Sequence, residues 1–314
     1  MDRHIWNALR RRGRNLAGRA AEHLPATIDA TQASLLRRID VSGYNVQGPP
    51  SLSAVKSQAC SAGQILEPVY ATWVGRLGQT RRFHRKQWEY VIALEAAEQA
   101  GLLRPGCSAL GFGVGTEPIP AILAAMGLDV LATDQAAENA GQWAEREEHA
   151  SSVEALQWPA VCEPDILRAH VRFLPVDMNE IPGDLGTHDL VWSSCAMEHL
   201  GSPQAGFDFV FRSLHLLRPG GLAVHTTEFD MTPGPTAVDY GNCALYRLAD
   251  LERLRDEAVG LGFAMDINPY VAFEHPADRA IAPPGTTGKE EFHLKLSLFD
   301  SVSTSFAIVI RRPA

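Results

Sequence analysis

Three closely spaced glycines stand where an apolar run gives way to a predicted helix. The segment Ser108-Ala-Leu-Gly-Phe-Gly-Val-Gly-Thr-Glu117 carries Gly111, Gly113 and Gly115. A turn without Cβ atoms lets the backbone approach a bulky polar ligand closely. The first N–H groups of a following helix lack partners within that helix and point toward such a ligand. This spacing predicts a binding site for a nucleotide-like cofactor.

Acidic residues follow the next two predicted strands. Asp134 stands 23 residues after Gly111, where a carboxylate can accept hydrogen bonds from both hydroxyls of a ribose. The alternative role for Asp134 is an N-cap for the next helix. Asp177 could hold an adenine amino group while Met178 lies against the ring. The alternative there is a loop aspartate beside a core methionine.

The end of the glycine turn separates two classes of nucleotide cofactor. Dinucleotide sites favour Gly-x-Gly-x-x-Gly, or alanine at the last position, because the helix must pack closely beneath a pyrophosphate. Here Gly111 and Gly113 are followed by Gly115, and Thr116 occupies that last position. The turn therefore favours a cofactor without a pyrophosphate over NAD.

The elements that must position these residues alternate between strand and helix. Strands are predicted at 107–111, 129–133, 171–176, 189–194 and 222–227, and helices at 117–126, 136–149, 204–217 and 248–260. This alternation predicts a doubly wound α/β fold with a mostly parallel sheet. Two β-rich runs near the end, 293–299 and 305–310, predict an antiparallel closing hairpin. Ligands bind such sheets at the topological switch point, and the glycine turn belongs there.

The first hundred residues differ in pattern from the rest. Residues 1–40 and 68–100 have helical composition, whereas residues 41–66 are richer in Gly, Pro and Ser. We therefore expect a helical N-terminal extension over 1–100 that acts as a lid. We expect a single cofactor-binding domain over 101–314.

Composition and charge limit the partners and the cellular location that we expect for the protein. The net charge is −9 and the five cysteines contain no C-x-x-C pair, which argues against a nucleic-acid partner, a disulfide framework and a structural zinc site. No apolar run is long enough to span a membrane, and the chain begins with no secretory signal pattern. A cytoplasmic location is the simplest expectation.

Basic residues cluster in two places. Residues 1–22 contain six arginines against Asp2 and Glu22, and residues 81–86 form a second cluster. We interpret both as solvated helix faces. The alternative is attraction to an anionic glycan, to a nucleotide-linked substrate or, for the N-terminus, to a membrane surface.

Taken together, these motifs resemble those of class I S-adenosylmethionine-dependent methyltransferases. The resemblance covers roughly residues 100–311 and rests on Leu110-Gly-Phe-Gly-Val-Gly115, Asp134, Val176-Asp-Met178, His188-Asp-Leu-Val-Trp-Ser-Ser-Cys195, Met197-Glu-His-Leu200 and Leu217-Arg-Pro-Gly-Gly-Leu222. It implies a Rossmann-like sheet of seven strands, the seventh antiparallel, and S-adenosyl-L-methionine as the cofactor.

The resemblance also implies a role for each cofactor residue. Gly111, Gly113 and Gly115 would line the methionine end, Asp134 the ribose, and Asp177 with Met178 the adenine. One position departs from the family pattern. Ala109 stands where the family often has an acidic residue beside the methionine amino group.

Candidate bases follow the fourth and fifth predicted strands. Methyl transfer from a sulfonium mainly requires alignment, but a hydroxyl acceptor must also lose its proton. His199 is our first choice as general base, followed by His225 and Glu228, with Glu198 beside His199. The alternatives are that Glu198 and His199 open or orient a helix, and that His225 is a hydrogen-bonded, half-buried histidine.

The same residues could instead hold a divalent cation. His225, Glu228 and Asp230, joined by Glu198 or His199, offer oxygen and nitrogen ligands. Their spacing is not diagnostic of any metal, so we assign none.

The sequence favours an enzyme that methylates a hydroxyl of a small-molecule or glycan acceptor. His225-Thr-Thr-Glu-Phe229 and the C-terminal hairpin are similar to methyltransferases of bacterial glycan-assembly pathways. A lipid or natural-product acceptor is one alternative, and a cofactor-binding or assembly subunit without catalysis is another. Ser193-Ser-Cys-Ala196 replaces the Asn-Pro-Pro-Tyr-like tetrad expected of nucleic-acid methyltransferases.

Overall fold

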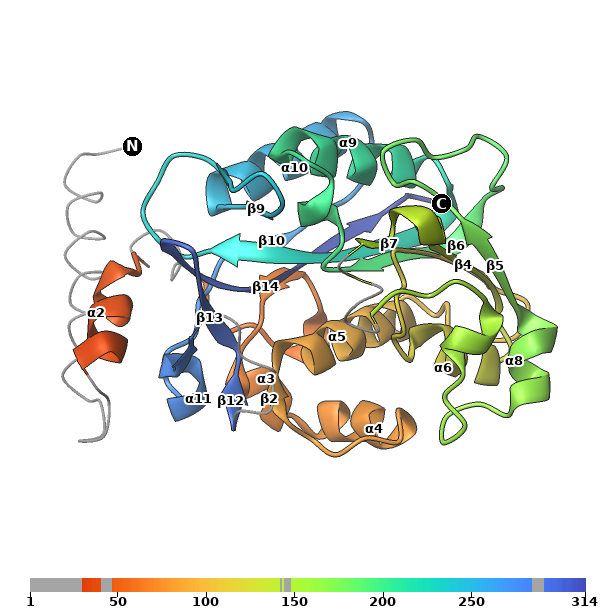
Figure 1. The fold of residues 1–314 in the computed structure, drawn as a ribbon, viewed down its shortest axis with the longest axis horizontal. Coiled ribbons are helices and arrows are strands. Elements are labelled where there is room, and N and C mark those ends of the chain that lie inside the picture. The colour runs from red at the N-terminus through yellow and green to blue at the C-terminus, as the bar shows by residue number, and fades with distance from the viewer. Residues whose placement is uncertain (1–29, 41–46, 142, 144–147, 284–290) are drawn as a thin grey trace.

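A ten-stranded sheet runs through the middle of the molecule (Figure 1). The computed structural model describes residues 30–40, 47–141, 143, 148–283 and 291–314. The strand order is β10-β1-β14-β7-β6-β3-β4-β5, with β13 paired to β14 and β11 to β13. Its parallel part consists of β3 (Ser108–Phe112), β4 (Asp129–Asp134), β5 (Val171–Pro175), β6 (His188–Ser194) and β7 (Leu217–Asp230).

An antiparallel hairpin closes this sheet. Strands β13 (Lys295–Leu298) and β14 (Ser301–Arg311) pair with each other, and β14 also runs antiparallel to β7. The predicted doubly wound fold with a closing hairpin is therefore confirmed. The sheet exceeds the predicted seven strands because β1 (Ser57–Ala59), β10 (Ile267–Asn268) and β11 (Ile281–Ala282) join it. Strands of two or three residues are too short to leave a periodic pattern in the sequence.

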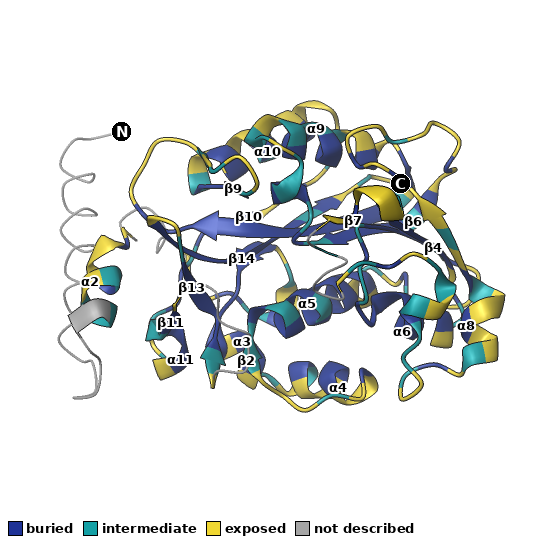
Figure 2. Ribbon diagram, viewed as in Figure 1, coloured by how far each residue is buried: buried dark blue, intermediate teal, exposed yellow. Residues whose placement is uncertain are grey.

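Helices cover both faces of the sheet, as Figure 1 shows. On one face lie α9 (Pro203–Leu214) and α10 (Leu248–Gly260). On the other lie α3 (Ala62–Leu66), α4 (Pro68–Arg76), α5 (Arg85–Gln99) and α6 (Ile119–Ala125). Figure 2 shows most of the sheet buried between these layers, with exposed residues on the outer faces of the helices and on the edge strand β5.

Alternate residues of each strand enter two separate apolar cores. Ala109 of β3 packs into the core under α4, α5 and α6, whereas Leu110 packs into the core under α9 and α10. The same alternation places Trp192 of β6 in the first core and Val191 in the second. A period of two is the expected result for strands covered on both faces.

Shorter elements complete the described part of the chain. Three of them are α-helices: α2 (Ala30–Arg38), α8 (Pro164–His170) and α11 (Pro276–Arg279). Four 3₁₀ turns lie at Leu52–Ala54, Ala137–Asn139, Val153–Leu156 and Met197–His199. Two small sheets pair β2 (Phe83–His84) with β12 (Phe292–His293), and β8 (Val238–Asp239) with β9 (Ala244–Leu245). Among the described residues no helix has the length and apolar character needed to cross a bilayer.

The first hundred residues contribute to both the sheet and its cover. β1 pairs antiparallel with β14, and most residues of α5 are buried. A helix buried on nearly all sides belongs to the interior of a domain. The basic segment 1–22 and residues 41–46 of the expected lid lie outside the described residues.

The predicted helices differ from the observed ones mainly at their ends. Proline at positions 118 and 120 delays the start of α6 to Ile119, since proline is tolerated only in the first turn. The helix predicted over 204–217 ends at Leu214, because β7 begins at Leu217. In the helix predicted over 136–149, the structure describes a 3₁₀ turn at Ala137–Asn139 and helical residues at 141 and 143. Residues 142 and 144–147 lie outside the described residues.

A buried ion pair joins the end of β7 to the start of α10. Asp230 is fully buried, and its Oδ2 accepts hydrogen bonds from Nε and Nη2 of Arg247 at 3.1 and 2.8 Å. The Ser301 hydroxyl donates to the same oxygen, and Thr232 donates to Oδ1. Loss of one partner from such a pair leaves an uncompensated buried charge.

Arg247→Ala should therefore lower the free energy of unfolding by about 3–5 kcal/mol. Urea denaturation at pH 7 would measure this loss. Arg168→Ala is the matched control because Arg168 and its partner Asp165 are 51% and 99% exposed, so its effect should stay within about 0.5 kcal/mol. Equal effects of the two substitutions would contradict the importance of the buried pair.

Candidate functional site

A cavity of about 1140 Å³ opens at the carboxyl ends of the parallel strands. It lies where β6 and β3 meet, and successive connections leave this point in opposite directions along the sheet. Ligand sites of open α/β sheets form at such switch points. The cavity brings together eight of the predicted site residues: Gly113, Gly115, Asp134, Asp177, Met178, Glu198, His199 and Glu228.

The glycine turn forms one wall and needs its glycines. Gly113 and Gly115 have φ angles of 57° and 49°, a region that L side chains rarely adopt. A Cβ on Gly113 would lie 2.9 Å from Cβ of Ala196, and one on Gly115 would lie 2.3 Å from the carbonyl oxygen of Glu148. The turn is therefore a cradle that side chains would fill.

Gly111 has a different role from its two neighbours. It does not line the cavity, and a Cβ at this position would lie 2.3 Å from the ring of Trp192. Gly111 thus lets Trp192 pack directly beneath the turn. The structure does not bring Gly111 to the cofactor side of the cavity.

Asp134 holds the turn in place while facing the cavity. Its Oδ2 accepts hydrogen bonds from the backbone N–H groups of Gly115 and Ala150, and its Oδ1 accepts one from Gln135. Because a carboxylate offers about four acceptor positions, one on Oδ1 remains for a ligand. Burial raises the pKa of Asp134, although these N–H groups oppose the shift.

The two residues expected near an adenine differ in exposure. Asp177 is exposed, and its Oδ1 accepts a hydrogen bond from the Asn179 N–H at 2.8 Å. Met178 is buried on the cavity wall, and its sulfur lies beside the turn at Gly113. Both residues line the same cavity as Asp134.

One ring nitrogen of His199 has no hydrogen-bond partner among the described residues. Its Nδ1 lies 2.7 Å from the carbonyl oxygen of Asn242, which can only accept, so Nδ1 carries the proton of the neutral ring. Nε2 of that tautomer can take a proton. The ring of Trp143 packs edge-on at 4.7 Å between centroids and fixes the orientation of the imidazole.

Glu198 is buried beside His199. Thr227 donates to its Oε2 at 3.1 Å, and its Oε1 has no hydrogen-bond partner among the described residues. Burial raises the pKa of Glu198, the charge of Glu228 raises it further, and His199 opposes both. Glu198 is thus an incompletely paired carboxyl group on the cavity wall.

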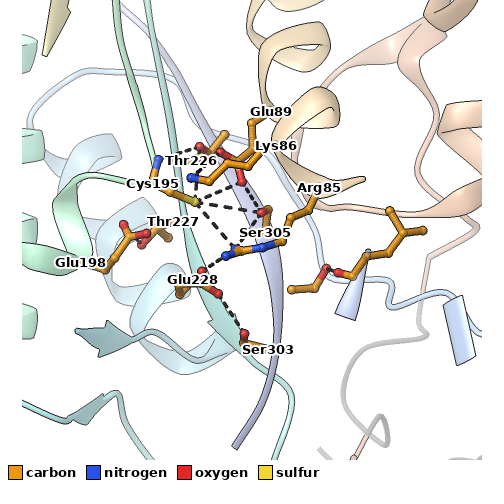
Figure 3. A network of polar contacts seen from close by, with 12 residues as sticks. Arg85, Lys86, Glu89, Cys195, Glu198, Thr226, Thr227, Glu228, Ser303 and Ser305 are labelled. Atoms are coloured by element: carbon orange, nitrogen blue, oxygen red, sulfur yellow. Dashed lines mark hydrogen bonds and ion pairs between the residues drawn. The ribbon is translucent and has the colours of Figure 1, made fainter. Parts of the chain in front are cut away.

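A buried polar network links the first turn of α5 to β7 and β14 (Figure 3). Arg85 forms an ion pair with Glu228, whose other oxygen accepts a hydrogen bond from Ser303 at 2.8 Å. Lys86 pairs with Glu89 at 3.3 Å, and Ser305 also donates to Glu89. Two cations of α5 are therefore each matched to a carboxylate.

The charges in this network set the protonation of Glu89. Burial alone would raise its pKa, but the charges of Lys86 and Arg85, with hydrogen bonds from Ser305 and Cys195, outweigh burial and lower the pKa. Glu89 is consequently an anion at neutral pH. Its negative charge is paired with the ammonium group of Lys86.

Cys195, Glu198 and Glu228 form a group of possible metal ligands. Their sulfur and oxygen atoms all lie within 4.8 Å of one another. The Arg85 guanidinium pairs with Glu228 and lies 4.0 Å from the Cys195 sulfur. This cation already pairs with Glu228, so a divalent cation in the group would meet electrostatic repulsion from Arg85.

Two residues considered from the sequence lie elsewhere. His225 is fully buried, and its ring packs against Phe209 on the α9 face. Ser213 uses its proton for the Val210 carbonyl, so it accepts from Nε2 of His225, and Ser193 donates to Nδ1. His225 is therefore withdrawn as a candidate base. Asp230 is bound by Arg247 and offers no cation site.

Other cavity residues were not among the predicted site residues. The wall also includes Glu117, Tyr90, Arg85, Lys86, Cys195, His84 and His293. The basic run at 81–86 was the one available signal, and its interpretation as a solvated face is wrong for Arg85, which is 8% exposed. His84 stacks on His293 at 4.6 Å, and burial, aided by His293, lowers the pKa of His84 to about 3.

The burial of His225 predicts a pH dependence of stability. Burial lowers the pKa of His225 to about 3, whereas the unfolded chain binds a proton near pH 6.5. The contribution is therefore complete above pH 6.5 and declines as the pH falls toward 3. Between pH 7 and 5 this histidine should cost the folded state about 2 kcal/mol.

Urea denaturation of the wild-type protein and of His225→Asn across this range would measure the difference. The variant should have the shallower loss of stability below pH 6.5, whatever its stability at pH 7. The exposed His215 is the matched control, and His215→Asn should keep the wild-type slope. Parallel curves for wild type and His225→Asn would contradict the neutral, buried state of His225.

No protein-family model and no curated protein sequence matches the chain. Among solved structures, it is similar to the CcbJ methyltransferase from Streptomyces caelestis, with 17% identity, 70% of this chain and 90% of that chain covered, and a TM-score of 0.38. It is also similar to the 1,6-didemethyltoxoflavin-N1-methyltransferase of Burkholderia thailandensis with bound S-adenosylhomocysteine, at 14% identity, 83% and 94% coverage and a TM-score of 0.42. A third is the glycopeptide N-methyltransferase MtfA, at 12% identity, 70% and 94% coverage and a TM-score of 0.41.

Proposed function

We propose that the protein transfers the methyl group of S-adenosylmethionine to a hydroxyl of a small-molecule or glycan acceptor. The observation that carries this proposal is one cavity that holds the cradle of Gly113 and Gly115, the acid Asp134 and the oriented base His199. Cofactor residues and a proton acceptor share the same space, as a group-transfer enzyme requires.

The cofactor side fits S-adenosylmethionine, which supplies a methyl group on a sulfonium when bound. Gly113 and Gly115 would receive its methionine end, because only glycine leaves room in the turn. The remaining acceptor position on Asp134 Oδ1 would take a ribose hydroxyl. Asp177 and Met178 would hold the adenine, one by its amino group and the other by its ring.

The acceptor side suits a hydroxyl nucleophile. An alcohol loses its proton as it attacks, and the Nε2 atom of His199 can receive that proton. The hydrogen bond to Asn242 would then stabilise the imidazolium, because Nδ1–H remains a donor in both protonation states. Glu198 lies directly beside this ring, and the mutual attraction that opposes the rise in the pKa of Glu198 also favours the imidazolium whenever Glu198 is ionised.

A polar wall favours a polar acceptor over a lipid. Arg85, Lys86 and Glu228 line the cavity together with His84 and His293. Sugar and other hydroxyl-rich acceptors can form further hydrogen bonds with these groups, whereas an acyl chain would displace water from them without replacing its hydrogen bonds. His84, Arg85, Lys86 and Tyr90 of the first hundred residues line the cavity, which supports a covering role for the N-terminal extension.

Binding of S-adenosylhomocysteine tests the cofactor assignment. We expect it to raise the melting temperature of the wild-type protein, whereas NAD should not. Gly113→Ala should weaken binding of S-adenosylhomocysteine about 5- to 150-fold, since steric changes in packed sites cost about 1–3 kcal/mol. Isothermal titration calorimetry would give both affinities.

Gly183→Ala is the matched control, because a Cβ there would meet no atom within 4 Å. This variant should bind S-adenosylhomocysteine like the wild type. If the wild-type protein does not bind S-adenosylhomocysteine, the proposed function is refuted.

Acceptor screening with labelled S-adenosylmethionine tests the role of His199. Once an acceptor is found, His199→Asn should lower kcat about 10²- to 10⁴-fold, the usual contribution of a general base. Its affinity for S-adenosylhomocysteine should stay near wild type, because His199 serves the acceptor side. Since Arg85 already pairs with Glu228 and would repel a divalent cation there, EDTA should leave the wild-type rate unchanged. Full activity of His199→Asn would exclude His199 as the base.

A further inference from the structure

The first strand of the cofactor site lacks the expected acid. Ala109 is fully buried in the apolar core under α5 and α6, so no charge of β3 faces the cofactor. The α-ammonium group of a bound S-adenosylmethionine would still require a negative partner, because an unpaired cation in a partly dry cavity is costly. Another residue must supply that charge.

Glu117 lies at the required place. It follows the glycine turn by two residues, lines the cavity and is 6% exposed. Its backbone N–H donates to the Val114 carbonyl, which ties the residue to the turn. The Glu117 carboxylate is therefore built into the cradle rather than into a mobile surface segment.

Residues of β6 hold the carboxylate in one orientation. The indole N–H of Trp192 donates to Oε1 of Glu117 at 2.6 Å, and Ser194 forms a second hydrogen bond. Trp192 reaches this position because Gly111 leaves room for its ring. Gly111 thus acts on the site indirectly, through Trp192 and Glu117.

Glu117 has no ion-pair partner among the described residues. The nearby cation Lys86 is paired with Glu89 at 3.3 Å. Burial raises the pKa of Glu117 to about 7 despite its two hydrogen bonds and the charge of Lys86. A buried carboxylate in this state gains from a cationic ligand that completes its pairing.

We infer that Glu117 binds the α-ammonium group at the methionine end of S-adenosylmethionine, in place of the acid missing from β3. This inference rests on the proposed function. It assigns a binding residue from the helix side of the glycine turn, where the two hydrogen bonds from β6 leave the carboxylate pre-oriented.

Two ligands that differ at the methionine end test this assignment. S-adenosylhomocysteine carries the α-ammonium group, whereas 5′-methylthioadenosine keeps the adenosine but lacks the amino-acid portion. By calorimetry, Glu117→Gln should bind S-adenosylhomocysteine about 10- to 100-fold more weakly, as expected for a lost charged hydrogen bond. Its affinity for 5′-methylthioadenosine should remain within about twofold of wild type, which also shows that the variant is folded.

Asp134→Asn is the matched control, because Asp134 would contact the ribose that both ligands share. It should weaken both ligands to a similar degree. If Glu117→Gln weakens both ligands equally, or neither, the assignment of Glu117 is overturned. If the wild-type protein binds neither ligand, the proposed function itself fails.

A deaminated analogue of S-adenosylhomocysteine provides a test that needs only the wild-type protein and so does not depend on how well a variant folds. Wild-type protein should bind this analogue about 10- to 100-fold more weakly than S-adenosylhomocysteine. Equal wild-type affinities would overturn the inference without any substitution. In Glu117→Gln the two ligands should bind alike, because the partner of the ammonium group is gone.

Discussion

The ion pair between Arg85 and Glu228 joins α5 to β7 at the cavity wall. Arg85 begins α5 and Glu228 lies near the end of β7, and both side chains are almost completely buried. Buried charges of opposite sign must stay together, because separating them leaves each in a medium of low polarity. The pair therefore holds the first turn of α5 against the sheet and contributes charged groups to the cavity wall.

The alternation of side chains along β7 explains how one strand serves both structure and site. His225 points toward α9, where two serine hydroxyls satisfy its ring. Glu228 points toward α5 and meets Arg85. Neighbouring residues of a strand face opposite sides, so residues close in sequence enter different environments. A histidine and a glutamate three residues apart consequently have unrelated roles.

Packing also links the glycine turn to the strand beside it. The missing side chain of Gly111 admits Trp192, whose indole N–H holds Glu117. Asp134 fixes the other end of the turn through backbone N–H groups. The turn is thus held from β4 and β6 at once, and its shape depends on contacts between segments distant in sequence. A rigid cradle of this kind favours binding because little ordering remains to be done.

The amino-acid sequence by itself determined the doubly wound fold, the glycine cradle and the position of Asp134, because strand periodicity and turn chemistry are local properties. It also indicated the pair Glu198 and His199 by their place after a strand. Only the tertiary structure decided that His225 is a core residue, that Arg85 is buried and that Glu117 lines the cavity. These outcomes depend on which face of a strand or helix packs against another element. In a strand, a shift of one residue moves a side chain from one face to the other and so reverses the outcome. The added strands β1, β10 and β11 form for the same reason, since pairing with a distant strand, and not local preference, makes such short segments extended.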